Sequence, residues 1–99
     1  MTITEFIPAR VDQDEGDAVA YWQDDGDEPG TWLGWVKADC EAKRRIVELH
    51  RPEAFADDPA LTFCAHCQRT AGEYPCQTVR ILATIWADHL DYREEWRAA

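Results

Sequence analysis

The sequence predicts an all-α fold: a small three-helix domain with a Cys-x-x-Cys knuckle loop, stapled by one structural zinc ion. Apolar residues recur at helical spacing in three stretches. Histidine and cysteine then follow the second stretch in the spacing His50-x13-Cys64-x2-Cys67-x8-Cys76. A chain of 99 residues fits a single domain over 1–99. A core this small often needs a metal ion or a disulfide as additional support.

Residues 3–22 are predicted to form the first helix, with Thr4 as its N-cap and Glu5 at the favourable end of the helix dipole. Its apolar side chains form a partial stripe: Phe6, Ile7, Val11, Ala18, Val19 and Trp22. A loop that is acidic and aromatic follows over 23–34. The ordered oxygen spacing of a calcium loop is absent from its polar part, 23–31, so we interpret these carboxylates as a solvated surface.

Residues 35–50 have the clearest helical periodicity. The apolar positions on one side are Val36, Cys40, Ile46, Val47 and Leu49. The basic run at 43–45 has acidic partners four residues away, which is typical of an exposed helix face and not of a nucleic-acid site. Pro52 is expected to end this second helix soon after His50.

Residues 51–75 are predicted to be a loop that carries the Cys-x-x-Cys, because prolines interrupt them and they have little periodicity. Residues 76–89 are predicted to form the third helix, with an apolar stripe at Val79, Leu82, Ala83 and Trp86. A terminal helical turn capped by Asp91 follows, with Tyr92 and Trp96 four residues apart on one face.

Three cysteines have the properties of zinc ligands. Cys64 and Cys67 can bind one ion, since a tight turn places both sulfurs on the same side. Cys76 supplies a third thiolate, which the N-terminus of the third helix would stabilise. A redox pair is disfavoured because the βαβ context of such motifs is missing. Disulfides are disfavoured because the sequence starts without the pattern of an export signal.

The fourth ligand has three candidates: Cys40, His50 and His66. Cys40 and His50 are ten residues apart on one predicted helix, or about 15 Å along its axis. Two ligands of one tetrahedral ion lie within about 4 Å of each other, so these two residues are alternatives. We favour His50, at the helix end beside the knuckle, and interpret Cys40 as a buried, inert thiol. His66 is expected to point away from the metal, but it stays an alternative, as does Cys40.

The pattern favours a protein that is not an enzyme. A site closed by four protein ligands leaves no position for a catalytic water. The sequence contains no nucleophile elbow, phosphate-binding loop or dinucleotide fingerprint. His89 is expected to contact the last carbonyls of the third helix. No catalytic residue and no cofactor beyond the structural Zn²⁺ is predicted.

The net charge of −10 limits the classes of partner. Residues 1–31 contain nine acidic residues and one basic residue, Arg10. This charge opposes direct binding to nucleic acid or to an anionic membrane, and favours a basic protein surface. The chain contains no long apolar run. We therefore expect a cytoplasmic protein whose partner is another protein.

Five segments together resemble one family. They are Phe6–Glu15, Glu41–His50, Cys64-x-x-Cys67, Tyr74-Pro-Cys76-x-Thr78-Val-Arg80 and His89-Leu-Asp91-Tyr-Arg-Glu-Glu-Trp96. This pattern is similar to that of small proteins from actinobacteria and their phages, classed as a domain of unknown function. The resemblance implies an intracellular setting in such an organism and no particular activity.

Three functional hypotheses follow. The first is a zinc-stapled interaction or regulatory accessory module. The second is an iron–sulfur redox or regulatory protein, since Cys40, Cys64, Cys67 and Cys76 distantly resemble the cysteine set of WhiB-like regulators. That family's shorter final cysteine gap and basic tail are missing here. The third is an acidic inhibitor of phage type that mimics nucleic acid through its N-terminal carboxylates.

Overall fold

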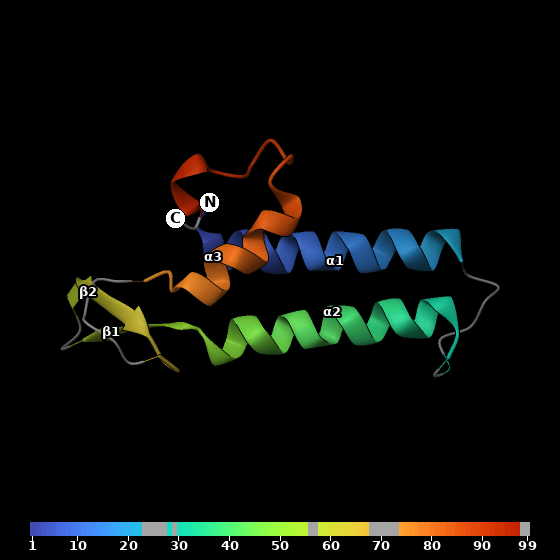
Figure 1. Ribbon diagram of the computed structural model, residues 1–99, viewed down its shortest axis with the longest axis horizontal. Coiled ribbons are helices and arrows are strands. Elements are labelled where there is room, and N and C mark those ends of the chain that lie inside the picture. The colour runs from blue at the N-terminus through green and yellow to red at the C-terminus, as the bar shows by residue number, and fades with distance from the viewer. Residues whose placement is uncertain (23–27, 29, 56–57, 68–73, 98–99) are drawn as a thin grey trace.

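The computed structural model describes residues 1–22, 28, 30–55, 58–67 and 74–97. Its elements are, in chain order, α1 (Ile3–Tyr21), α2 (Trp32–Leu49), β1 (Pro52–Phe55), β2 (Asp58–Cys64), α3 (Gln77–Ala83) and the 3-10 helices η1 (Thr84–Trp86) and η2 (Glu94–Trp96). Helices α1 and α2 lie antiparallel, α3 crosses them, and the β1–β2 hairpin extends beyond one end of α2 (Figure 1). The three predicted helices are confirmed. The all-α class is corrected to a mostly helical fold with a small two-stranded sheet.

Helix α1 begins with a capping box. The backbone amide of Glu5 donates to Oγ1 of Thr2 at 3.2 Å, and the amide of Thr2 donates to the Glu5 carboxylate at 2.9 Å. The N-cap is therefore Thr2, and the prediction of Thr4 was wrong. The reason is the Thr-x-x-Glu spacing from Thr2, which satisfies two terminal amides at once.

Helix α2 begins at Trp32, three residues before its predicted start, so 32–34 are helical and not part of a loop. Thr31 caps it by accepting from the amide of Gly34 at 3.0 Å. Gly34 is required here, because a Cβ at this position would collide with the backbone carbonyl of Glu28. These contacts fix the chain where it enters the helix.

A β-hairpin replaces much of the loop predicted over 51–75. Strands β1 and β2 are antiparallel, and Pro52 lies opposite Cys64. The strand-forming run 62–64 stabilises this pairing, but it is too short for its alternation to stand out in the sequence. Parts of the predicted loops lie outside the described residues: 23–27, 29, 56–57 and 68–73.

The third helix is shorter than the predicted 76–89. It ends at Ala83 and continues as the 3-10 turn η1. The hydroxyl of Thr84 donates to the carbonyl of Ile81 at 2.5 Å. Such a local bond from a hydroxyl competes with regular helix hydrogen bonding, which accounts for the early end.

The C-terminal segment also differs in detail from its prediction. Its helical turn is η2, which begins at Glu94, and Asp91 does not cap it. The amide of Asp91 instead donates to Nδ1 of His89 at 3.0 Å. The His89 ring thus closes a turn of its own and does not bind the last helix carbonyls.

The core is centred on Phe6, which is fully buried. Four rings from the C-terminal part of the chain surround it, with centroids 5.0–6.4 Å away: Trp86, His89, Tyr92 and Trp96. Aromatic pairs in such edge-on and tilted geometries add stability beyond their buried area. The first turns of α1 are thereby joined to the end of the chain.

Contacts between α1 and α2 are partly polar. Arg44 of α2 pairs with Asp12 at 2.9 Å and with Glu15 at 2.6 Å, both on α1. These carboxylates raise the pKa of Arg44 above its usual range. Within the described ranges, no helix is both long enough and apolar enough to span a bilayer.

We expect Phe6→Ala to lower the free energy of unfolding by about 3–5 kcal/mol, because it removes a fully buried ring and leaves a cavity. Ile81→Ala is the matched control, since that side chain is 55% exposed. It should change stability by no more than about 0.5 kcal/mol. Urea unfolding followed by circular dichroism measures both. Equal effects would show that the core is not centred on Phe6.

Candidate metal centre

Four side chains from three segments meet where the helical pair joins the hairpin. His50 is the C-cap of α2, and Cys64 is the last residue of β2. Cys67 lies three residues further on, and Cys76 is the N-cap of α3. Their potential ligand atoms all lie within 4.8 Å of one another. Among the described residues, this is the one group of His, Cys, Asp or Glu side chains placed to hold a metal ion together.

The three sulfur atoms surround a single nitrogen. Nδ1 of His50 lies 3.3 Å from Sγ of Cys64, 3.7 Å from Sγ of Cys67 and 3.5 Å from Sγ of Cys76. Zinc–sulfur and zinc–nitrogen bond lengths at tetrahedral angles place nitrogen and sulfur ligands about 3.6 Å apart. The three nitrogen–sulfur separations bracket that value. The arrangement therefore fits a tetrahedral metal ion.

Hydrogen bonding alone does not account for this arrangement. A neutral imidazole nitrogen has either one proton or one lone pair, so Nδ1 can satisfy one thiol at a time. Three nearly equal contacts to His50 would leave two of them unsatisfied. A shared ion satisfies all four ligand atoms, which is why the site could hold a metal.

The hairpin register brings the ligands together. Because Pro52 pairs with Cys64, the strand returns to the end of α2, next to His50. The amide of Ala65 then donates to the carbonyl of Arg51 at 2.9 Å, which holds the base of the knuckle. In the knuckle itself, the amide of Cys67 faces Sγ of Cys64 at 3.5 Å.

The surroundings prepare His50 and Cys64 to act as ligands. Burial, and to a lesser extent electrostatic repulsion between its ring and that of His66, lowers the pKa of His50 and so favours the neutral ring that can bind a metal. Burial acts to raise the pKa of Cys64, but hydrogen bonds from the amides of Cys67 and His66 and from neighbouring thiols lower it overall. The hydrogen bond to Cys64 raises the pKa of Cys67 to about 11, so its thiol is protonated before metal binds.

The residues chosen from the sequence separate clearly in space. The four proposed ligands converge. Cys40 lies elsewhere, on the side of α2 that faces the hydrophobic core, and its thiol is 3.9 Å from the carbonyl of Val11. Its side chain is buried, as expected. His66 is exposed, and its ring packs edge-on against His50 at 4.9 Å between centroids. The sequence reading missed the hairpin that positions Cys64, and the strand-forming residues before that cysteine were the available signal.

A family model described as a family of unknown function, DUF6221, matches residues 34–98. The chain belongs to this family. The matched range contains all four residues of the candidate centre and the whole of the hairpin. Neither a curated protein nor a solved structure matches the chain.

Removing one ligand should abolish tetrahedral metal binding. We expect wild-type protein titrated with Co²⁺ to develop the intense visible bands of a tetrahedral, sulfur-rich site at one ion per chain, and Cys67→Ser to lose them. Cys40→Ala is the matched control, since it removes a cysteine outside the cluster, and it should retain the spectrum. A Cys40→Ala spectrum as weak as that of Cys67→Ser would place Cys40 among the ligands.

Metal affinity should fall as the pH falls. Cys67, with a pKa of about 11 in the metal-free chain, must lose a proton on binding, and each proton released costs about tenfold in affinity per pH unit. The lowered pKa of His50 means that protonation of this ring competes with the metal only at a lower pH than for an ordinary histidine. Competition with a chromogenic chelator between about pH 6 and pH 8 measures the slope. A metal affinity that does not change with pH would contradict proton release from Cys67 on binding.

Proposed function

We propose that the centre holds one structural Zn²⁺ and that the protein is a non-enzymatic interaction or regulatory accessory module. The observation that carries the proposal is the single nitrogen of His50 facing three cysteine sulfurs at tetrahedral separations. Zinc would join the end of α2, the knuckle and the start of α3. It would thereby supply folding energy to a chain with a small core.

Two observations favour zinc over an iron–sulfur cluster: the residue types of the four ligands and the short distances between their ligand atoms. The iron–sulfur hypothesis needs Cys40 as the fourth thiolate, and that thiol lies apart from the other three in the helical core. The ligands of a cluster also bind different iron atoms and so spread more widely than the ligands of one ion. A set whose atoms all lie within 4.8 Å suits a single metal.

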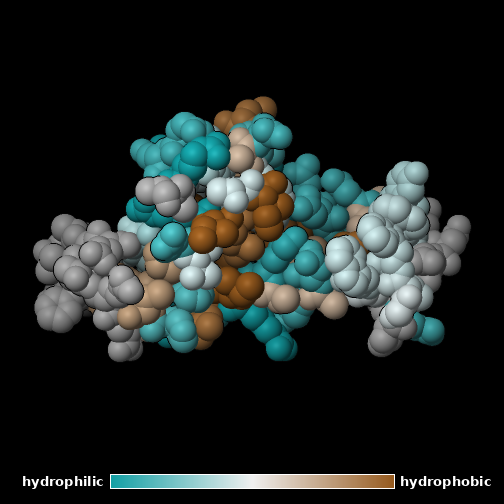
Figure 2. Space-filling model, viewed as in Figure 1, coloured by the Kyte–Doolittle hydropathy of each residue, from teal (hydrophilic) through white to brown (hydrophobic). Residues whose placement is uncertain are grey.

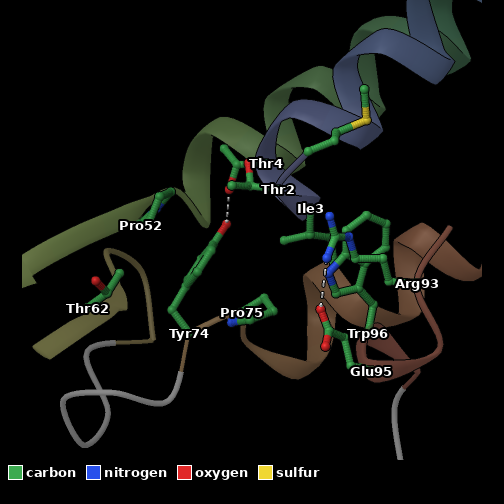
Figure 3. A pocket seen from close by; sticks show the side chains of 11 residues that line it. Thr2, Ile3, Thr4, Pro52, Thr62, Tyr74, Pro75, Arg93, Glu95 and Trp96 are labelled. Atoms are coloured by element: carbon green, nitrogen blue, oxygen red, sulfur yellow. Dashed lines mark hydrogen bonds and ion pairs between the residues drawn. The ribbon is translucent and has the colours of Figure 1, made fainter. Parts of the chain in front are cut away.

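A structural role is favoured over zinc catalysis because the four ligands complete a tetrahedron. A catalytic zinc keeps a position open for water or substrate. A nearby pocket of about 580 Å³ offers no better candidate for catalysis (Figure 3). Its main polar groups already pair with one another: Thr4 with Tyr74 at 3.1 Å, and Arg93 with Glu95 at 3.7 Å.

The chemistry of the cysteines also supports a reducing, cytoplasmic setting. All four are free of disulfides, and zinc thiolates persist where thiols stay reduced. The acidic charge of the chain disfavours nucleic acid as a direct ligand. We therefore propose a protein partner.

Metal analysis combined with chelation tests the proposal. We expect protein purified without added metal to be colourless and to contain one zinc per chain. A strong chelator should abolish its cooperative thermal transition, and added Zn²⁺ should restore it. Brown protein containing iron and sulfide after anaerobic purification would replace zinc with a cluster. An unchanged transition after complete zinc removal would refute the structural role.

A further inference from the structure

Four aromatic rings form a continuous cluster where the helical pair is joined, at the far end from the metal centre. Tyr21 and Trp22 are 4.5 Å apart between ring centroids, and Trp22 and Trp32 are 5.3 Å apart. Trp32 stacks on Trp35 at 5.3 Å, with 25° between the ring planes. We call these four residues the aromatic end. Figure 2 shows side chains of intermediate hydropathy, the class to which tryptophan and tyrosine belong, gathered over this end of α1 and α2.

The aromatic end is exposed. Tyr21 is 78% exposed, Trp35 59%, Trp32 49% and Trp22 37%. Contiguous exposed apolar surface on a protein marks an interaction site, and tryptophan and tyrosine are among the residues that carry most binding energy at interfaces. Trp32 and Trp35 lie in the first turn of α2, directly after its N-cap Thr31. The capped helix therefore fixes the backbone positions of these two rings.

This surface is separate from the metal centre. Trp32 is the first residue of α2, and His50 directly follows its last. Eighteen residues of helix place them about 27 Å apart along the axis. Figure 1 likewise shows the hairpin and the start of α2 at opposite ends of the molecule. Changes at the aromatic end therefore leave the metal ligands untouched.

The sequence that contains the aromatic end is acidic. From Tyr21 to Trp35 the sequence contains four carboxylates and no basic residue. Asp17, which is exposed, lies four residues before Tyr21 on the same helix. Lys37 is the nearest basic residue in sequence, and beyond it lies Asp39. Exposed tryptophan faces attract cationic side chains through their rings, and a chain of net charge −10 attracts them through its charge.

We propose that the aromatic end binds an arginine-containing basic segment of a partner protein. Arginine fits best because its planar guanidinium stacks on aromatic rings while its charge pairs with carboxylates. The proposal rests on the proposed function as an interaction module and names its class of partner. Nucleic bases could also stack on tryptophan, but their phosphates would be repelled, as would an anionic membrane. A second copy of this chain, with a net charge of −10, is disfavoured for the same reason.

The test uses the full zinc-loaded chain and three short peptides of one design, in which glycine alternates with arginine, lysine or citrulline. Citrulline keeps the shape of arginine and removes its charge. Tryptophan fluorescence and titration calorimetry at about 0.15 M salt measure the dissociation constants. We expect the arginine peptide to bind more tightly than the lysine peptide, and the citrulline peptide to bind at least tenfold more weakly, as a cation–π and charge-pair mode requires.

Two variants then locate the surface. Trp35→Ala should weaken binding of the arginine peptide by about tenfold. Ile81→Ala should leave binding unchanged, since its side chain has similar exposure (55%) but lies on α3. Both variants should keep one zinc per chain and the wild-type thermal transition, which shows that any loss of binding comes from the surface.

Several results would overturn the proposal. They are no binding of the arginine peptide by zinc-loaded wild-type protein, equal binding of the citrulline peptide, equal loss in both variants, or tighter binding to single-stranded DNA or anionic vesicles than to the peptide. Each leaves the zinc site in place. Failure of the proposed function shows itself differently, as purified chain without zinc or as folding that does not depend on it.

Discussion

The convergence of three cysteine sulfurs on one nitrogen of His50 is the constraint on which the rest of the structure depends. The four side chains belong to the end of α2, the knuckle after β2 and the start of α3. The hairpin extends beyond the helices (Figure 1), and the amide of Ala65, which donates to the carbonyl of Arg51 at 2.9 Å, holds its base near the end of α2. A single ion at this point would hold the hairpin, the helical pair and the C-terminal part of the chain together.

The buried aromatic layer around Phe6 complements this constraint. It attaches the first turns of α1 to the C-terminal segment, and buried residues of all three helices pack beside it in the same core. The candidate centre lies where the end of α2 meets the start of α3. Helix α3 takes part in both, with Val79 and Ala83 buried in the core and Cys76 at its start. The core and the candidate centre thus share one short helix, α3. The aromatic end lies at the opposite end of the helical pair, where its rings are exposed.

The sequence predicted the long elements, and the meeting of His50 with Cys64, Cys67 and Cys76, better than the connections. The helices followed from their apolar periodicity, and helix geometry alone separated Cys40 from His50, as the structure also does. The hairpin was missed because its strands are short and interrupted by Pro52 and Pro59, so that pairing between them, and not local pattern, decides their structure. The start of α1 at residue 3 was predicted correctly, but its N-cap was assigned to the wrong residue because two threonines compete as caps. Only the reciprocal bonds with Glu5 distinguish them.

X-ray absorption at the zinc edge of the purified protein reports ligand types and distances around the metal itself, and so tests whether one zinc ion binds His50 and the three cysteines. We expect three sulfur ligands at about 2.3 Å and one nitrogen ligand at about 2.0–2.1 Å, with no iron present. Four sulfur ligands would bring Cys40 into the centre and contradict the ligand set. An oxygen ligand in place of one sulfur would reveal an open coordination position and contradict the structural role.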